Sequence, residues 1–218
     1  MAKVVILGAG VMGSAMAVVA GDQGHMVRLV GTHLDEGIIR SVAETRLHPK
    51  LGVMLSSTVT AYPCDGFDQA MKGGADLLIL GVSSAGVGWA IDRIAEVVGG
   101  ALPVLMITKG LLPKDGSIEV LPVLGAREVE ARTGVRLPVM AVGGPCIAGE
   151  LAAKRDTSVV ITGHNRHLLD RTIGFLDAPY YHARASEDVV GVEVCAAFKN
   201  LYAIGVGSAN GIDRKSVV

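Results

Sequence analysis

Neither sign of charge is in excess in this sequence. The 20 basic and 21 acidic residues give a formal net charge of −1, and no long run of one sign occurs. Nucleic-acid-binding proteins usually carry a basic patch or stripe, so this balance argues against DNA or RNA as a partner. Internal repeats, low-complexity tracts and flexible linkers are also missing from the sequence.

Cysteine is scarce as well. Cys64, Cys146 and Cys195 are too few and too widely spaced for a disulfide framework or a structural zinc site. We therefore expect a protein of a reducing compartment, the cytoplasm by default, that holds no structural metal.

No segment of the sequence is typical of a membrane span. Residues 4–21 are almost continuously apolar behind Lys3, as in a signal peptide, but glycines interrupt them where an export helix needs none. A later apolar run, residues 77–91, is broken by serines and glycines.

Apolar residues are abundant: they make up 50% of the chain, and the mean hydropathy is +0.46. Short β-branched runs alternate with helical patterns, which is typical of an α/β protein with a doubly wound, Rossmann-type sheet. We expect strands at residues 3–7, 25–30, 75–80, 103–107, 138–142 and 157–161, and helices at 12–22, 35–46, 87–98, within 143–154 and at 189–209.

A domain boundary is expected near Ala185, because the spacing of glycines changes there and a long apolar helix begins. The sequence then divides into a dinucleotide-binding domain, residues 1–185, and the start of an all-helical substrate domain, residues 186–218. The final residues abandon the apolar pattern, so the second domain looks unfinished.

The most specific local motif is Gly8-Ala9-Gly10-Val11-Met12-Gly13, which lies between a predicted strand and a predicted helix. In that context Gly8 permits a tight turn, Gly10 lets the backbone approach a pyrophosphate, and Gly13 lets the helix pack closely on the strand. The helix N-terminus offers N–H groups to the phosphates, so we expect NAD or NADP as the cofactor. A glycine-rich turn without a ligand is the alternative interpretation.

The end of the second strand bears on the choice between the two cofactors. NAD-specific sites usually place an acidic residue there to bind the ribose. Here Gly31-Thr32-His33 occupies that place and Asp35 follows later, so nothing repels a 2′-phosphate and we expect NADP to be accepted. Thr32 and His33 are expected near that phosphate, unless both are simply loop residues. Asp35 is available as the cap of the next helix.

Two lysines are candidates for chemistry. Hydride transfer belongs to the nicotinamide, so the protein must supply orientation and a group that exchanges a proton. Lys109 follows strand 103–107 at the carboxyl edge of the sheet, and Lys199-Asn200 is a polar pair in an apolar helix. A desolvated lysine gives up its proton more readily, which suits an acid or a base. The alternatives are a solvated loop lysine and a helix lysine that snorkels to water. Weaker candidates are Ser83, Ser84, His48 and Cys146.

Several segments together resemble the bacterial and archaeal NAD(P)-dependent glycerol-3-phosphate dehydrogenases. Besides the opening glycines, they are Thr-Lys-Gly at 108–110, Gly-Pro-Cys-Ile-Ala-Gly-Glu-Leu-Ala at 144–152, Gly-Val-Glu at 191–193, Lys-Asn-Leu at 199–201 and Ala-Ile-Gly at 203–205. They occur in the family's order over nearly the whole chain. The resemblance implies the reversible reduction of dihydroxyacetone phosphate, a small phosphate ester, to sn-glycerol 3-phosphate.

The resemblance also implies roles for single residues. Lys199 would donate and accept the proton, and Lys109 would contact both the substrate and the cofactor. The remaining implied roles are substrate contact by Gly144, Cys146 and Asn200, and cofactor contact by Val11, Met12, Thr32 and Ala148.

This chain departs from the family at two places. Cys146 replaces the usual Ser or Thr, which loses a hydroxyl donor at similar size. After Asn210-Gly211 the family continues with helices that supply a substrate-binding arginine, whereas this chain ends eight residues after Asn210. We interpret it as a shortened relative whose activity the truncation can impair.

There are two alternative interpretations. One is a non-catalytic dinucleotide-binding protein or fragment, and the other is a β-hydroxyacid or ketopantoate-type reductase. A partner chain, such as the second copy in a homodimer, could cover the exposed helix.

Overall fold

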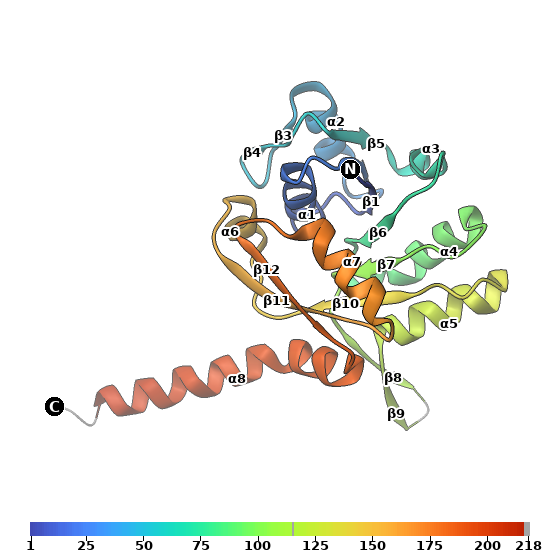
Figure 1. Ribbon diagram of the computed structural model, residues 1–218. Coiled ribbons are helices and arrows are strands. Elements are labelled where there is room, and N and C mark those ends of the chain that lie inside the picture. Colours follow the sequence, from blue (N-terminus) through green and yellow to red (C-terminus); the bar gives the residue numbers. More distant parts are fainter. Residues whose placement is uncertain (115, 216–218) are drawn as a thin grey trace.

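A computed structural model describes residues 1–114 and 116–215, and in this part of the chain eight strands form one sheet (Figure 1). The strand order is β12-β11-β10-β7-β6-β1-β2-β5. Six neighbouring strands are mutually parallel, namely β10, β7, β6, β1, β2 and β5. Strand β11 runs antiparallel to β10 and parallel to β12. Their bounds are β1 Lys3–Leu7, β2 Met26–Val30, β5 Val59–Tyr62, β6 Leu77–Leu80, β7 Val104–Met106, β10 Val139–Gly143, β11 Thr157–Thr162 and β12 Tyr181–Ser186.

Helices cover both faces of the sheet because its central strands are apolar on both sides. In β1, Val4 and Ile6 point into one core and Val5 and Leu7 into the other. The first core is completed by α1 (Val11–Asp22), α2 (Glu36–Thr45), α6 (Ala148–Ala152) and α7 (Arg166–Leu176). The second core is completed by α3 (Phe67–Met71), α4 (Val87–Val97) and α5 (Leu121–Thr133).

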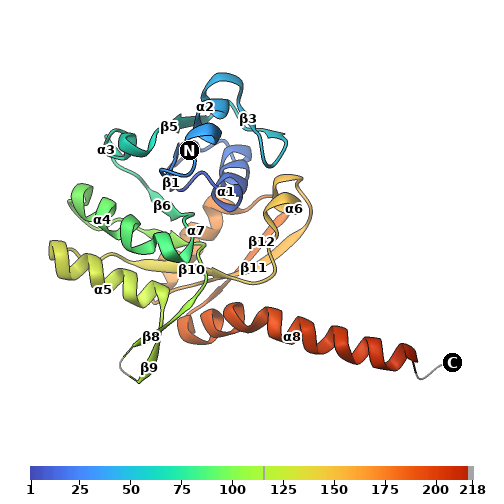
Figure 2. The ribbon, with the colours of Figure 1, turned by 180° about the vertical axis from the view of Figure 1, so that it is seen from behind.

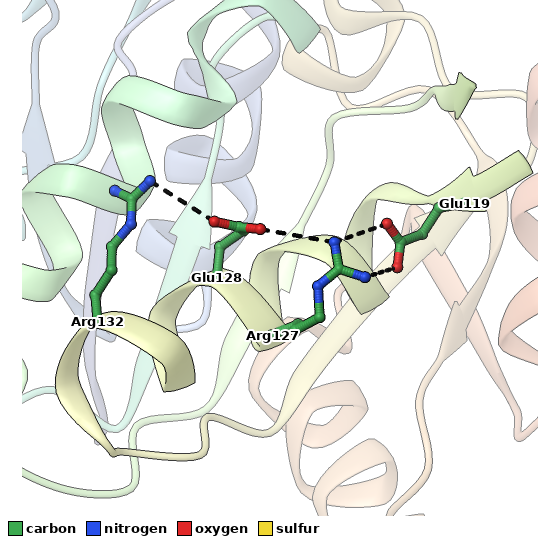
Figure 3. A network of polar contacts seen from close by, with 4 residues as sticks. All are labelled: Glu119, Arg127, Glu128 and Arg132. Carbon is green, nitrogen blue, oxygen red and sulfur yellow. Dashed lines mark hydrogen bonds and ion pairs between the residues drawn. The ribbon is translucent and has the colours of Figure 1, made fainter. Parts of the chain in front are cut away.

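Two short hairpins and two 3-10 turns connect these layers. The hairpins are β3 (Leu47–His48) with β4 (Val53–Met54), and β8 (Leu111–Lys114) with β9 (Ser117–Val120); the 3-10 turns are η1 (Cys64–Gly66) and η2 (Ser84–Gly86). Glu119 of β9 forms a bidentate ion pair with Arg127 of α5, and Glu128 lies between Arg127 and Arg132 (Figure 3). Arg132 also pairs with Asp92 of α4, so this network links a hairpin and two helices on one face.

The sequence-based prediction of a doubly wound Rossmann-type sheet is confirmed. Every strand and helix expected in the first 185 residues is present within a few residues of its expected bounds. The structure adds the edge strand β5, in a segment where we expected neither a strand nor a helix. It also adds both hairpins, three helices and one more strand, namely α3, α5, α7 and β12.

The chain changes direction at β1. β2 and β5 lie on one side of β1, and the chain then crosses to β6 on its other side. This arrangement leaves a topological switch point between the carboxyl ends of β1 and β6, which is where open α/β sheets bind their ligands.

The last helix, α8 (Val189–Lys215), extends away from the sheet in both views (Figures 1 and 2). Its first turns pack on β10 and bury Val189, Glu193 and Ala196. From residue 197 to residue 211 every side chain is exposed. The division into domains at Ala185 stays a prediction, because the first turns of α8 pack against the sheet.

By length and composition alone, residues Val189–Gly211 of α8 are apolar enough to cross a membrane. One such helix is weak evidence, because core helices of soluble proteins have the same length and composition. The segment also carries Glu193 and Lys199. The expectation of no membrane span stays a prediction.

Candidate active site

The glycine-rich loop lies at the switch point, between β1 and α1. Gly8 has φ of +111°, a conformation that a side chain rarely adopts, and a Cβ there would come within 2.7 Å of the Gly81 backbone after β6. A Cβ on Gly13 would come within 2.0 Å of the Gly8 oxygen, so this glycine brings α1 against β1. Gly10 differs, since its missing Cβ would meet nothing within 4 Å. The open space at Gly10 is therefore available to a ligand.

Helix α1 begins without a side-chain cap. Gly10 is the N-cap, no side chain accepts a hydrogen bond from the first turn, and that turn contains no acidic residue. The positive end of the helix dipole therefore stays available to an anion at the loop. Val11 and Met12, the expected cofactor contacts, form the first turn, with Val11 41% exposed.

The Ala9 peptide is held by three buried side chains. Its N–H donates to Asp35 Oδ2 over 3.1 Å, and its carbonyl accepts from Ser14 Oγ over 3.0 Å. The same carbonyl lies 3.2 Å from His48 Nε2, while the other ring nitrogen, Nδ1, accepts from the Leu51 N–H over 3.1 Å. Nε2 must then carry the proton, so neutral His48 donates to Ala9, and burial lowers its pKa in agreement.

Asp35 does not cap α2 through its side chain, which corrects part of its expected role. It occupies the N-cap position, but its carboxylate turns back into the protein. Oδ2 accepts from the Thr32 N–H over 2.9 Å and from the Thr32 hydroxyl over 2.8 Å, in addition to Ala9. The carboxylate therefore joins the glycine-rich loop to the loop after β2, and it is only 7% exposed.

The loop after β2 opens onto a pocket of about 540 Å³. Thr32 and His33 line it together with Trp89 and Arg93 of α4. The rings of His33 and Trp89 meet edge to face at 6.4 Å, and Arg93 Nη1 pairs with Glu96 over 2.6 Å. Arg93 Nε is buried without a hydrogen-bond partner in the described structure. The remaining lining residues are Glu36, Ile39, Pro63, Cys64 and Asp65.

Lys109 lies at the carboxyl end of β7, as predicted. The preceding residue, Thr108, donates to the Val82 carbonyl over 2.6 Å, which fixes the end of β7 to the end of β6. Lys109 is half-buried, and this burial lowers the pKa of its ammonium. The fields of Cys146, Lys199 and Glu193 also reach it, so these four groups share one region.

Gly144 and Cys146 follow β10, the strand next to β7. Gly144 has φ of +117°, and a Cβ there would lie 3.3 Å from the β11 backbone, so only glycine allows this turn. Cys146 is half-buried and burial raises its thiol pKa, although Lys109 and Lys199 act in the opposite direction. Those two cations are the neighbours that its sequence context did not reveal.

Ala148, the expected nicotinamide contact, begins α6. This helix packs on α1, which starts at the glycine-rich loop. The structure therefore brings Ala148 to the first face of the sheet, on the same side as α1.

Lys199 and Asn200 are exposed on the protruding part of α8. The field of Lys199 still reaches Lys109 and Cys146, so the lysine lies near the same edge of the sheet. The sequence places this polar pair in an apolar helix, where we considered a desolvated lysine. In the structure the pair is exposed to solvent, so Lys199 is not desolvated there.

Sequence reasoning missed several residues of this region. His48 was only a weak candidate, Glu193 was named only as part of the Gly-Val-Glu segment, and Trp89 and Arg93 were not considered. A second pocket of about 450 Å³, lined by α5, β10, the start of α7 and Val189, contains none of the predicted site residues.

A glycine-rich loop at the switch point, an uncapped α1 and lysines at the same sheet edge define a Rossmann-type dinucleotide-binding protein. The model of the NAD-dependent glycerol-3-phosphate dehydrogenase N-terminus matches residues 3–169. The chain belongs to this family.

Individual relatives agree with this assignment. The NADP(+)-dependent glycerol-3-phosphate dehydrogenase of Archaeoglobus fulgidus is 32% identical over 213 residues, covering 97% of this chain and 62% of the relative. The glycerol-3-phosphate dehydrogenase [NAD(P)+] of Shouchella clausii is 29% identical, covering 97% and 61%. The crystal structure of the Coxiella burnetii glycerol-3-phosphate dehydrogenase superposes with a TM-score of 0.79 at 25% identity, covering 97% and 62%. The chain thus spans about 60% of the length of these relatives.

Proposed function

We propose that this chain binds NAD or NADP along the carboxyl edge of its sheet and serves the interconversion of dihydroxyacetone phosphate and sn-glycerol 3-phosphate. One observation carries the proposal: the glycine-rich loop, Lys109 and Cys146 follow parallel strands and so share one edge, which the field of Lys199 also reaches. Family membership and the names of the relatives support the same reaction.

The loop residues fit a dinucleotide. The open space beside Gly10 and the uncapped start of α1 suit a pyrophosphate held by Val11 and Met12. The pocket beside Thr32 and His33 suits the adenosine end, and Ala148 is assigned to the nicotinamide end. The nicotinamide supplies the hydride when it is bound.

The two lysines act on the phosphate ester. Lys109 is a cation at the edge of the sheet, suited to an anionic substrate held beside Gly144 and Cys146. Lys199 would give its proton to the carbonyl oxygen during reduction and take it back during oxidation. Asn200, next to it, offers an amide that can donate to a substrate hydroxyl.

Two measurements test the proposal. The first is the enhanced fluorescence of NADPH and NADH on titration with the purified chain. The second is their oxidation when dihydroxyacetone phosphate is added. We expect both cofactors to bind, and turnover to be lost in Lys199→Ala but kept in Lys72→Ala, an exposed control. Turnover that survives Lys199→Ala contradicts the role of this lysine, and failure of both cofactors to bind contradicts the whole proposal.

A non-catalytic dinucleotide-binding protein is the second candidate. The observation in its favour is that Lys199 and Asn200 are solvated, whereas proton transfer is most efficient in a closed site. Under this proposal both cofactors bind, and dihydroxyacetone phosphate causes no oxidation of NADPH or NADH.

We also propose a cytoplasmic location and a homodimer formed through the exposed face of α8.

A further inference from the structure

Glu193 is a buried carboxylate for which the proposed mechanism has no role. It lies in the second turn of α8, where the helix packs on β10; a Cβ on Gly143, for example, would lie 2.5 Å from Val192 Cγ1. Its side chain has 0% exposure, and neither carboxylate oxygen has a hydrogen-bond partner in the described structure. A buried ionised carboxyl without compensation is costly, so a nearby positive charge is needed if Glu193 is to ionise.

Lys109, at the end of β7, is the charged group whose field reaches Glu193. Among the described residues, no other titratable group acts on this carboxyl, and Glu193 acts on Lys109 in return. Lys109 also feels Cys146 from the loop after β10 and Lys199 from α8. On the other elements that contact α8, the ionisable residues are Glu119 of β9, which is paired with Arg127, and Lys114 of β8.

Burial disfavours the charged form of both Lys109 and Glu193, whereas the attraction between the two groups favours it. Burial and the like charge of Lys199 both lower the pKa of Lys109, which favours the neutral amine. Burial raises the pKa of Glu193 to about 7, although Lys109 opposes the rise. Each group thus favours the charged form of the other, and no other charged group acts on the carboxyl among the described residues.

We propose that Glu193 is a positioning residue whose buried carboxylate is the countercharge of Lys109, and that it keeps this lysine charged at the end of β7 to receive an anionic phosphate ester. The purpose assigned to the charge rests on the proposed function. The pairing itself rests on burial, the missing hydrogen-bond partners and the mutual field.

The test measures the titration of Lys109 directly, without cofactor or substrate. The full chain and Glu193→Gln are treated briefly with a small amine-acylating reagent between pH 6 and pH 10, and acylation of each lysine is quantified by peptide mass spectrometry. We expect the midpoint for Lys109 to fall by about one pH unit in Glu193→Gln, so that Lys109 reacts about tenfold faster at pH 7. Exposed Lys72, measured in the same digest, should not change.

An unchanged midpoint for Lys109 in a folded Glu193→Gln protein overturns the proposal. If that variant does not fold, the reverse substitution decides. Lys109→Met removes the cation, so the carboxyl of Glu193, followed by NMR of carbon-13-labelled glutamate, should titrate at higher pH than in the wild type. A carboxyl that titrates identically in both proteins overturns the proposal as well.

The outcome is separable from that of the proposed function. A shifted Lys109 midpoint in a chain that binds neither NADPH nor NADH would support the electrostatic coupling of Lys109 with Glu193 and reject the dehydrogenase. Cofactor binding with an unshifted midpoint would do the reverse.

Discussion

Ala9 is the residue through which most of the cofactor loop is fixed. Its N–H and carbonyl are engaged by Asp35, Ser14 and His48, which come from three different segments. Because these side chains are buried, each lost bond would leave a polar group without a partner, at a cost of about 1–3 kcal/mol. The loop is therefore rigid before any ligand arrives, and ordering it costs little on binding.

We predict that His48 makes the protein less stable in mild acid. Burial lowers the pKa of His48, so the unfolded chain takes up a proton that the folded chain resists. The stabilising contribution is complete above the ordinary histidine pKa of 6.5 and is lost as pH falls through it towards the lowered value. Thermal unfolding followed from pH 8 to pH 5 should show a smaller acid loss for His48→Gln than for the wild type.

The comparison with His48→Gln is needed because Glu193 has the opposite dependence. Burial raises the pKa of Glu193 to about 7, so its contribution is most favourable below the ordinary glutamate pKa and declines as pH rises towards 7. The carboxyl is present in both proteins, so its effect cancels in their difference. Parallel curves for the two proteins would show that His48 titrates alike in the folded and unfolded states.

We predict that Gly10→Ala weakens cofactor binding without weakening the fold. The added methyl group meets nothing within 4 Å in the protein, and the φ of −62° suits any residue, so only a ligand at the loop can clash with it. The affinity for NADPH should fall about tenfold, or ~1.4 kcal/mol, by fluorescence titration. Gly37→Ala in α2, equally unobstructed, is the control. Equal affinities in both variants would place the pyrophosphate elsewhere.

We predict that Arg93 favours NADP over NAD. It lines the pocket beside Thr32 and His33, and its guanidinium carries donors besides the Nη1 that pairs with Glu96, so it can still donate to a phosphate. Arg93→Met should lower the affinity for NADPH about tenfold and change the affinity for NADH less than about twofold. Arg166→Met, an exposed arginine paired with Asp170, is the control. An equal loss for both cofactors would show that Arg93 supports the pocket without reading the 2′-phosphate.

Single residues differed in how well the sequence predicted them. Lys109 was predictable because the end of an apolar strand places a residue at a known edge of the sheet. Glu193 was not, because its burial depends on α8 packing over β10, a contact between segments about 50 residues apart. The contacts of Arg93 and Asp35 were not predictable for a similar reason, since the residues that they contact are brought near them only by the folded sheet.

At the scale of elements, β1 and α1 form the most tightly determined unit. Their approach depends on Gly13, where a Cβ would lie 2.0 Å from the Gly8 carbonyl oxygen. That oxygen is part of the backbone and cannot move aside as a flexible side chain could. The loop geometry and the packing of α1 are therefore set together.

We predict that Gly13→Ala destabilises the protein although it lies three residues from the tolerant Gly10. The methyl group must push α1 away from β1, and overpacking of this kind costs about 3 kcal/mol. Urea unfolding should show a lower midpoint for Gly13→Ala than for the wild type, while Gly10→Ala stays close to the wild type. A Gly13→Ala protein of wild-type stability would mean that the loop and helix can separate freely.

The elements that the sequence missed share a physical feature. β5 and β12 lie at the two edges of the sheet, and residues such as Thr60 and His182 give them a polar side that hides the apolar pattern of a buried strand. The segment of α5 has little amphipathic pattern, because charged residues surround its few buried positions. Central strands such as β6, by contrast, are buried on both sides and appear as unbroken apolar runs.

At the scale of the whole molecule, the sheet and its helices bury their apolar surfaces and the outer part of α8 does not. Exposed fractions reach 61% at Leu201, 67% at Tyr202 and 68% at Ile204. Apolar side chains gathered along one solvated helix usually mark an interface.

We predict that the 218-residue chain associates with itself through α8 and that the association is independent of cofactor binding. Leu201 and Ile204 are one helical turn apart and so share a face, and glutamates at both positions would place like charges against each other in a paired helix. Light scattering should show an oligomer for the wild type and a monomer for the Leu201→Glu, Ile204→Glu double variant. Met54→Glu, a change at an equally exposed position on β4, should leave the oligomer intact.

Cofactor titration of the same proteins tests whether self-association through α8 and cofactor binding are independent. The double variant should bind NADPH as the wild type does, because the glycine-rich loop and the pocket beside Thr32 contain no residue of α8. A wild-type monomer at high concentration would show that α8 is stable without a second copy. An oligomer that loses NADPH affinity when it dissociates would mean that the neighbouring chain completes the site, and the solvated Lys199 would then be expected to act across that interface.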